Sequence, residues 1–241
     1  MSTERIIDIS ADADALADRA ADWFVAELAS RPGPLAVALS GGSTPKRLYE
    51  RLARDPWRSG LPFDRIHWFW GDERIVAADD ARRNTLMVET SLLAHVPVPP
   101  ENIHIIAASP TTPEDAASAY EAELKRFYGT DTLAPDRPLF DIMLLGVGSD
   151  GHTASLFPGK PSLAVRDKWV VASEPGLDPF VPRVTLTFPA IASSRAVAFL
   201  AAGADKKPIL DKVFSGADLP SAHITAAGPI HWFLDQAAVG Q

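Results

Sequence analysis

A carboxylate and an imidazole lie two residues apart in a glycine-rich segment, at Asp150 and His152. An imidazole titrates near neutral pH, and beside a carboxylate it can act as a general base toward water. The segment follows Phe140–Leu145, a continuous apolar run typical of a buried strand. In open α/β sheets, ligands bind just beyond the carboxyl ends of the strands. We therefore expect Asp150 and His152 to be the catalytic pair.

A second segment, Ser-Gly-Gly-Ser-Thr-Pro at residues 40–45, follows the apolar run Leu35–Leu39 and precedes a helical pattern. A glycine-rich turn that leads into a helix presents free backbone N–H groups to an anion. Because Pro45 suits an early helical position, we expect Ser43 or Thr44 as the N-cap of the helix. The alternative to an anion site is a tight strand–helix turn with a capping hydroxyl. As phosphate-binding candidates we take the residues of this turn: Gly41, Gly42, Ser43 and Thr44.

The same turn argues against three common sites. It lacks the lysine of a P-loop and the third glycine of a dinucleotide fingerprint, so neither ATP nor NAD is expected as a cofactor. Pro45 stands where a nucleophile elbow needs its last glycine, so Ser43 is not expected to form an acyl-enzyme.

Charged residues follow other predicted strands. Asp72 and Arg74 come directly after Ile66–Trp70, where Arg74 could contact a phosphate or carboxylate through two hydrogen bonds. A solvated turn is the alternative for these charges. Arg183 flanks another strand, and Lys206 lies just past a strand at the start of a helix, where it could reach a ligand phosphate. On spacing alone, Arg183 would only flank its strand and Lys206 would be a solvated helix residue. We include all four as substrate-binding candidates.

No metal is expected. Asp72, Asp150 and His152 have ligating side chains, but no His-x-x-x-His or Glu-x-x-His spacing accompanies them.

Strand-like and helical patterns alternate along the chain, which indicates an α/β fold with a mostly parallel sheet and helices on both faces. We expect one domain over residues 1–241. The helical spacings lie at Asp12–Ser30, Thr44–Arg54, Pro113–Tyr128 and Asp205–Phe214, the third with Thr112 as N-cap. The strand-like runs are Leu35–Leu39, Ile66–Trp70, Ile103–Ile106, Phe140–Leu145, Trp169–Ala172, Val184–Phe188 and Ala196–Ala201.

The composition restricts the partners. The 241-residue chain has a formal net charge of −8 and no Lys/Arg-rich run, so a nucleic-acid partner is not expected. It has no cysteine, which excludes disulfides and thiolate chemistry. Its apolar runs are shorter than the ~18–20 residues of a membrane helix, and Met1–Arg5 is polar, without the apolar core of a secretory signal. We expect a cytoplasmic protein with no membrane partner.

Taken together, the segments closely resemble the 6-phosphogluconolactonase family, in the family's order and over nearly the whole chain. The matching segments are Leu39–Pro45, Trp70–Arg74, Asn84–Thr85, Leu145–Pro158, Arg183–Thr187, Gly203–Lys206 and Trp232–Asp235. The resemblance implies a Rossmann-like fold, hydrolysis of a sugar-phosphate lactone, and no cofactor or required metal. We expect a monomer or a weak homodimer.

The same superfamily includes glucosamine-6-phosphate deaminase, which is the alternative activity. The deaminase pattern has Asp-Glu-Tyr where this chain has Asp72-Glu73-Arg74, and a glutamate where this chain has Phe157. The lactonase reaction needs only an activated water and does not need that glutamate. A non-catalytic sugar-phosphate-binding regulator would not need His152. We therefore expect a lactonase with His152 as the general base.

Overall fold

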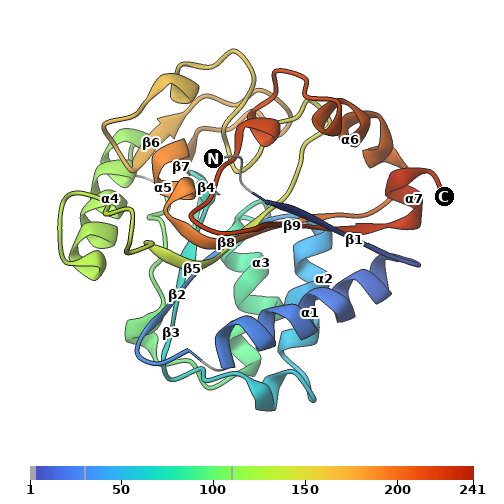
Figure 1. The fold of residues 1–241 in the computed structure, drawn as a ribbon. Helices are drawn as coiled ribbons and strands as arrows, with labels where there is room; N and C mark the ends of the chain where they lie inside the picture. The colour runs from blue at the N-terminus through green and yellow to red at the C-terminus, as the bar shows by residue number, and fades with distance from the viewer. Residues whose placement is uncertain (1–3, 30, 110) are drawn as a thin grey trace.

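The computed structural model describes residues 4–29, 31–109 and 111–241. Six parallel strands form the central sheet in the order β1-β9-β8-β5-β2-β3 (Figure 1). This confirms the predicted α/β class. The strands are β1 (Arg5–Ser10), β2 (Leu35–Leu39), β3 (Ile66–Trp70), β5 (Phe140–Leu145), β8 (Ser194–Ala201) and β9 (Ile230–Asp235).

A small antiparallel sheet lies beside the central one, in the order β4-β7-β6. Its strands are β4 (Asp72–Arg74), β6 (Val170–Ser173) and β7 (Arg183–Leu186). Strand β6 lies one residue later than the predicted run Trp169–Ala172, and β7 ends two residues earlier than the predicted run Val184–Phe188. Strand β4 was not predicted: residues 72–74 pair with β7 and do not form a solvated turn, which was the alternative for these charges.

Helices cover both faces of the central sheet, as predicted. Neighbouring residues of a strand point to opposite faces. On β9, Phe233 packs against Trp23 of α1, whereas Trp232 packs against Phe214 of α6. The helices are α1 (Ala13–Ala29), α2 (Ser43–Leu52), α3 (Asn84–Ser91), α4 (Pro113–Tyr128), α5 (Phe188–Ala192), α6 (Lys207–Phe214) and α7 (Gln236–Val239).

Helix α4 begins and ends where its sequence signals place it. The Thr112 hydroxyl accepts a hydrogen bond from the backbone N–H of Asp115, and Pro113 occupies the first turn. Gly129 ends the helix in the left-handed conformation at φ 84°. Local chemistry therefore sets both ends of this element.

Other elements differ from the prediction. The Ile103–Ile106 segment is not a strand: Ile103 makes a single bridge to Trp68, and Ile105 is 51% exposed beyond the edge of the sheet. Strands β1 and β9 were not predicted, nor was α3. Met1–Thr3 and Ser30, which belong to the predicted polar N-terminus and the end of the first helix, lie outside the described residues. Within the described ranges, no helix is long and apolar enough to cross a membrane.

Candidate active site

The sheet order places the site. Strand β2 pairs with β3 on one side and β5 on the other, and the chain continues from β5 to β8 and β9 in the opposite direction across the sheet. Such a reversal leaves a crevice beyond the carboxyl ends of the strands. A pocket of about 350 Å³ opens there. The predicted residues that line it are His152, Gly41, Gly42, Ser43, Thr44, Asp72, Arg74, Arg183 and Lys206.

The glycine turn presents the start of α2 to this pocket. Gly42 is the N-cap, with φ 107°, a conformation that favours glycine. This corrects the expectation that Ser43 or Thr44 caps the helix: both lie inside its first turn, and no side chain caps it. The uncapped first turn leaves backbone N–H groups for an anion.

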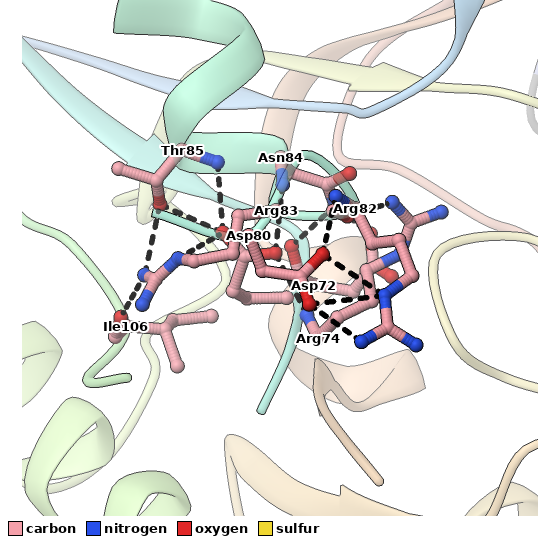
Figure 2. Close-up of polar contacts among 9 residues, drawn as sticks. Asp72, Arg74, Asp80, Arg82, Arg83, Asn84, Thr85 and Ile106 are labelled. Carbon is pink, nitrogen blue, oxygen red and sulfur yellow. Dashed lines mark hydrogen bonds and ion pairs between the residues drawn. The ribbon is translucent and has the colours of Figure 1, made fainter. Parts of the chain in front are cut away.

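Gly41 is required by a close approach rather than by its dihedral angles. A Cβ at this position would lie 2.0 Å from Oδ1 of Asn84. Asn84 is the first residue of α3 and lines the pocket. Its Nδ2 donates to the backbone carbonyl of Asp72 at 2.9 Å (Figure 2). The glycine turn and β4 are therefore joined through one buried amide.

Asp72 is 5% exposed and accepts hydrogen bonds on its side chain. Ser155 Oγ donates to its Oδ2 at 2.5 Å, and Asn84 Nδ2 lies 3.4 Å from its Oδ1. Ser155 follows the turn that carries Asp150 and His152, so this contact ties the β5 side of the pocket to the β4 side. Asn84 and Ser155 were not among the predicted site residues. Their only signal in the sequence is their place in segments that resemble the family.

Asp150 and His152 form the expected pair. The His152 ring nitrogen Nδ1 lies 2.6 Å from Oδ1 of Asp150, which also accepts the His152 backbone N–H at 3.0 Å. An ionised carboxylate can only accept, so in the neutral imidazole this contact places the proton on Nδ1 and leaves the lone pair on Nε2. Asp150 does not line the pocket itself and lies behind the imidazole.

Two neighbours fix the plane of the imidazole. Phe157 is 1% exposed and its ring centroid lies 4.4 Å from that of His152. On the Gly148 side there is no space: a Cβ at this residue would lie 2.1 Å from the Cε1 and Nδ1 atoms of the ring. Gly148 was not predicted as a site residue. Phe157 occupies the position where the deaminase pattern has a glutamate.

Three cations face the same pocket: Arg74, Arg183 and Lys206. Lys206, at the end of a short 3₁₀ turn before α6, reaches across to donate to the Val147 carbonyl at 3.1 Å. Within the described residues, the Nε atoms of Arg74 and Arg183 are buried without a hydrogen-bond partner. Burial lowers the pKa of the Arg183 guanidinium, and the nearby Asp72 carboxylate opposes that change. An anion in the pocket would compensate these partly desolvated charges.

In the part of the chain that the structure describes, no three His, Asp or Glu side chains gather closely enough to hold an ion.

The sequence model of the family described as glucosamine-6-phosphate isomerases/6-phosphogluconolactonase matches residues 11–232. The chain belongs to this family. A 6-phosphogluconolactonase of Nostoc sp. is 40% identical over 98% of this chain and 97% of the relative. One of Synechocystis sp. is 44% identical over 84% of this chain and 82% of the relative.

Solved structures agree with this assignment. The crystal structure of a 6-phosphogluconolactonase from Thermotoga maritima is similar at a TM-score of 0.83 and 31% identity, over 96% of this chain and 100% of that one. A 6-phosphogluconolactonase from Trypanosoma brucei is similar at 0.85 and 30%, over 99% of both chains. A monomeric glucosamine-6-phosphate deaminase shares the fold, at 0.79 but only 22% identity, over 98% of this chain and 99% of that one.

Proposed function

We propose that this chain hydrolyses 6-phospho-D-glucono-1,5-lactone to 6-phosphogluconate, a step of the oxidative pentose phosphate pathway. The observation that carries this proposal is the Asp150–His152 pair, which presents a basic imidazole to a pocket that also holds three cations. A lactone with a phosphate group needs both, an activated water at one end and positive charge at the other. The curated relatives named 6-phosphogluconolactonase support the same activity.

In this proposal Nε2 of His152 takes a proton from a water molecule as its oxygen attacks the lactone carbonyl carbon. Asp150 keeps the proton on Nδ1 and stabilises the imidazolium that forms. When the bond between the carbonyl carbon and the ring oxygen breaks, the proton on Nε2 passes to that oxygen. The immediate product is a carboxylic acid with a free hydroxyl at the former ring oxygen. The acid then releases its proton to solvent and becomes the carboxylate, with no covalent enzyme intermediate.

Hydrogen-bond donors are available both for the phosphate of the substrate and for the negative charge that develops on its carbonyl oxygen during the reaction. We place the phosphate against the first turn of α2 at Ser43 and Thr44 and against Arg74 and Lys206, with Arg183 as a weaker candidate. The amides of Gly41 and Gly42, or Arg74, would stabilise the charge that develops on the carbonyl oxygen. Asp72 would orient the sugar, because its carboxylate is held in the pocket wall.

The test is hydrolysis of freshly generated lactone, measured above its spontaneous background, for the wild type and for His152→Ala. Loss of the general base should lower kcat by at least ~10²-fold and change KM little. A variant with near-normal kcat would remove His152 from this role. If the wild type itself gave no rate above background, ammonia release from glucosamine 6-phosphate would be measured next.

Three further expectations belong to this proposal. The residues 1–241 form one domain, the enzyme acts in the cytoplasm, and it is a monomer or a weak homodimer. Size-exclusion chromatography with light scattering, over a range of protein concentrations, tests the last of these.

A further inference from the structure

Glu73 is a carboxylate with no access to solvent, at 0% exposure in the middle of β4. A buried carboxylate is costly unless hydrogen bonds compensate the lost hydration. Here Oε1 accepts the backbone N–H groups of Arg74 at 2.7 Å and Asn84 at 2.8 Å. Oε2 accepts the backbone N–H of Thr85 at 2.8 Å and its hydroxyl at 2.7 Å. The carboxylate is therefore fully engaged, although no part of it lines the pocket.

The side chain of Glu73 caps the N-terminus of α3. The N-cap residue of this helix, Arg83, makes no capping hydrogen bond with its side chain. Instead the first two amides of the helix, at Asn84 and Thr85, donate to Glu73 from a neighbouring strand. The Arg83 guanidinium is also buried, with Nε 3.6 Å from Oε2 of Glu73 and one amino group donating to the Ile106 carbonyl at 2.9 Å (Figure 2).

Two of the three residues that donate to Glu73, Arg74 and Asn84, line the pocket. The backbone of Arg74 is bonded directly, and its guanidinium donates to the Arg82 carbonyl at 2.5 Å (Figure 2). Asn84 carries the other connection, because its side chain contacts the Asp72 carbonyl and fills the space beside Gly41. A shift at the start of α3 would therefore reach β4 and the glycine turn together.

We propose that Glu73 is a positioning residue for catalysis, which acts through Arg74 and Asn84 and does not touch the substrate. The inference rests on the proposed function, because lactone hydrolysis is its readout. A cap that served only stability would leave the kinetics of the folded enzyme unchanged. A positioning role requires that the same hydrogen bonds set the place of the pocket cations.

The first variant is Glu73→Gln, which keeps the shape of the side chain but replaces one acceptor oxygen by an NH₂ group. That group would face either the Arg74 and Asn84 amides or the two donors of Thr85, and cannot accept from them. At a temperature where the variant is fully folded, kcat/KM should fall about 10-fold or more, because small misplacements of catalytic groups are costly.

Glu121→Gln is the matched control. Glu121 also accepts two backbone N–H groups, those of Trp169 and Val170, but it lies on α4 and outside the pocket. This variant should lose stability and retain the wild-type kcat and KM. Equal losses of kcat/KM in the two variants would overturn the positioning role, since they would report stability alone.

Double-mutant cycles test whether Glu73 acts through Arg74 or through Asn84. Combined with Arg74→Ala or with Asn84→Ala, Glu73→Gln should cost clearly less than it does alone, and it should change the same parameter, kcat or KM, as its partner variant. Independent effects in both cycles, or wild-type kinetics of Glu73→Gln, would overturn the inference. A wild type without lactonase activity would instead refute the proposed function, so the two failures are distinct.

Thr85→Val is the second variant if Glu73→Gln does not fold. It removes the hydroxyl, which donates to Oε2 and accepts from the Arg83 guanidinium at 3.3 Å, and it keeps the backbone N–H. Neither Thr85 nor Arg83 lines the pocket, so a fall of about 3-fold in kcat/KM would come through the buried Glu73–Arg83 pair. Unchanged kcat/KM in this variant would count against the inference.

Discussion

The imidazole of His152 is held on three sides by residues that do different things. Asp150 accepts from Nδ1 and sets the tautomer, whereas Phe157 packs against the ring. Gly148 leaves only the room that the ring occupies. The turn itself is closed by the Gly148 N–H, which donates to the His152 carbonyl at 2.9 Å. In the proposed reaction, an imidazole held in this way would be oriented before the substrate binds, which is what proximity effects require.

Gly148→Ala should therefore disable the base without touching it. The new methyl group would overlap the ring atoms and push the imidazole away from Asp150, because a Cβ at 2.1 Å cannot be accommodated. We expect kcat to fall by ~10²-fold. Steady-state kinetics checks this, with Gly129→Ala as control: that glycine is left-handed and has open space around it, so its variant should lose stability alone. Normal kcat in Gly148→Ala would show that the ring tolerates displacement.

Lys206→Ala tests whether the phosphate of the substrate binds at Lys206. Its ammonium donates to the Val147 carbonyl, beside the turn that carries Asp150 and His152, and lines the pocket. Loss of this charge should raise KM for the phosphorylated lactone and leave kcat closer to normal, because binding rather than chemistry loses a partner. The measurement compares the phosphorylated lactone with glucono-1,5-lactone. If the preference for the phosphorylated form were unchanged, the phosphate would lie elsewhere.

At the scale of elements, two buried tyrosines hold the ends of neighbouring strands. The Tyr49 hydroxyl, on α2, accepts from the Ser40 N–H at 3.0 Å and donates to its carbonyl at 2.8 Å. The Tyr120 hydroxyl, on α4, makes the same two bonds to Trp70, at 2.7 and 3.1 Å. Burial raises the pKa of both phenols, so they stay neutral donors. Each hydroxyl satisfies the backbone where its strand leaves the sheet.

Tyr49→Phe should cost about 1–3 kcal/mol of unfolding free energy, because both backbone groups of Ser40 would be buried without a partner. Urea unfolding measures this loss. Tyr120→Phe is the matched variant, with a similar loss at Trp70. Of Ser40 and Trp70, only Ser40 lines the pocket. Tyr49→Phe should therefore also lower kcat/KM, whereas Tyr120→Phe should not. Equal kinetics in the two variants would show that the strand end tolerates the missing bonds.

At the scale of the whole molecule, a line of titratable groups runs along the β3 edge, away from the pocket. His67 Nδ1 lies 3.0 Å from His104 Nε2, and His104 Nδ1 lies 2.6 Å from Glu123, which also pairs with Arg126. Burial lowers the pKa of His104, although Glu123 opposes this. Burial also lowers the pKa of His67, and the neighbouring His104 adds to the effect.

The folded protein should therefore lose stability as the pH falls below about 6.5, the ordinary histidine value. Because the pKa values of these histidines are lower in the folded protein, the unfolded chain binds protons first as the pH falls. Above about pH 6.5 both states hold neutral histidines and the free energy of unfolding is unaffected, whereas below it proton binding favours the unfolded chain. Tm measured from pH 7.5 to 5 checks this. His67→Gln should flatten the curve, and His223→Gln, on the exposed surface, should not. A Tm independent of pH over this range would contradict the prediction.

Predictions from sequence succeeded where local chemistry decides the outcome. The limits of α4 follow from Thr112, Pro113 and Gly129, and the buried run Phe140–Leu145 is a strand as expected. They failed where a distant residue completes an element. Helix α3 has no cap of its own, because Glu73 supplies it from β4. Strand β1 lies at the sheet edge and keeps Ile7 at 51% exposure, so it carries no buried apolar pattern.

Residue types and short spacings are enough to find the groups of the candidate site in the sequence: an imidazole beside a carboxylate, a glycine turn, and cations after strands. That Asn84, Ser155 and Gly148 lie with them, and that Glu73 is buried while its neighbours line the pocket, depends on the folded structure. Contacts of this kind join segments up to 83 positions apart, and they depend on strand order and side-chain packing, which no local pattern specifies.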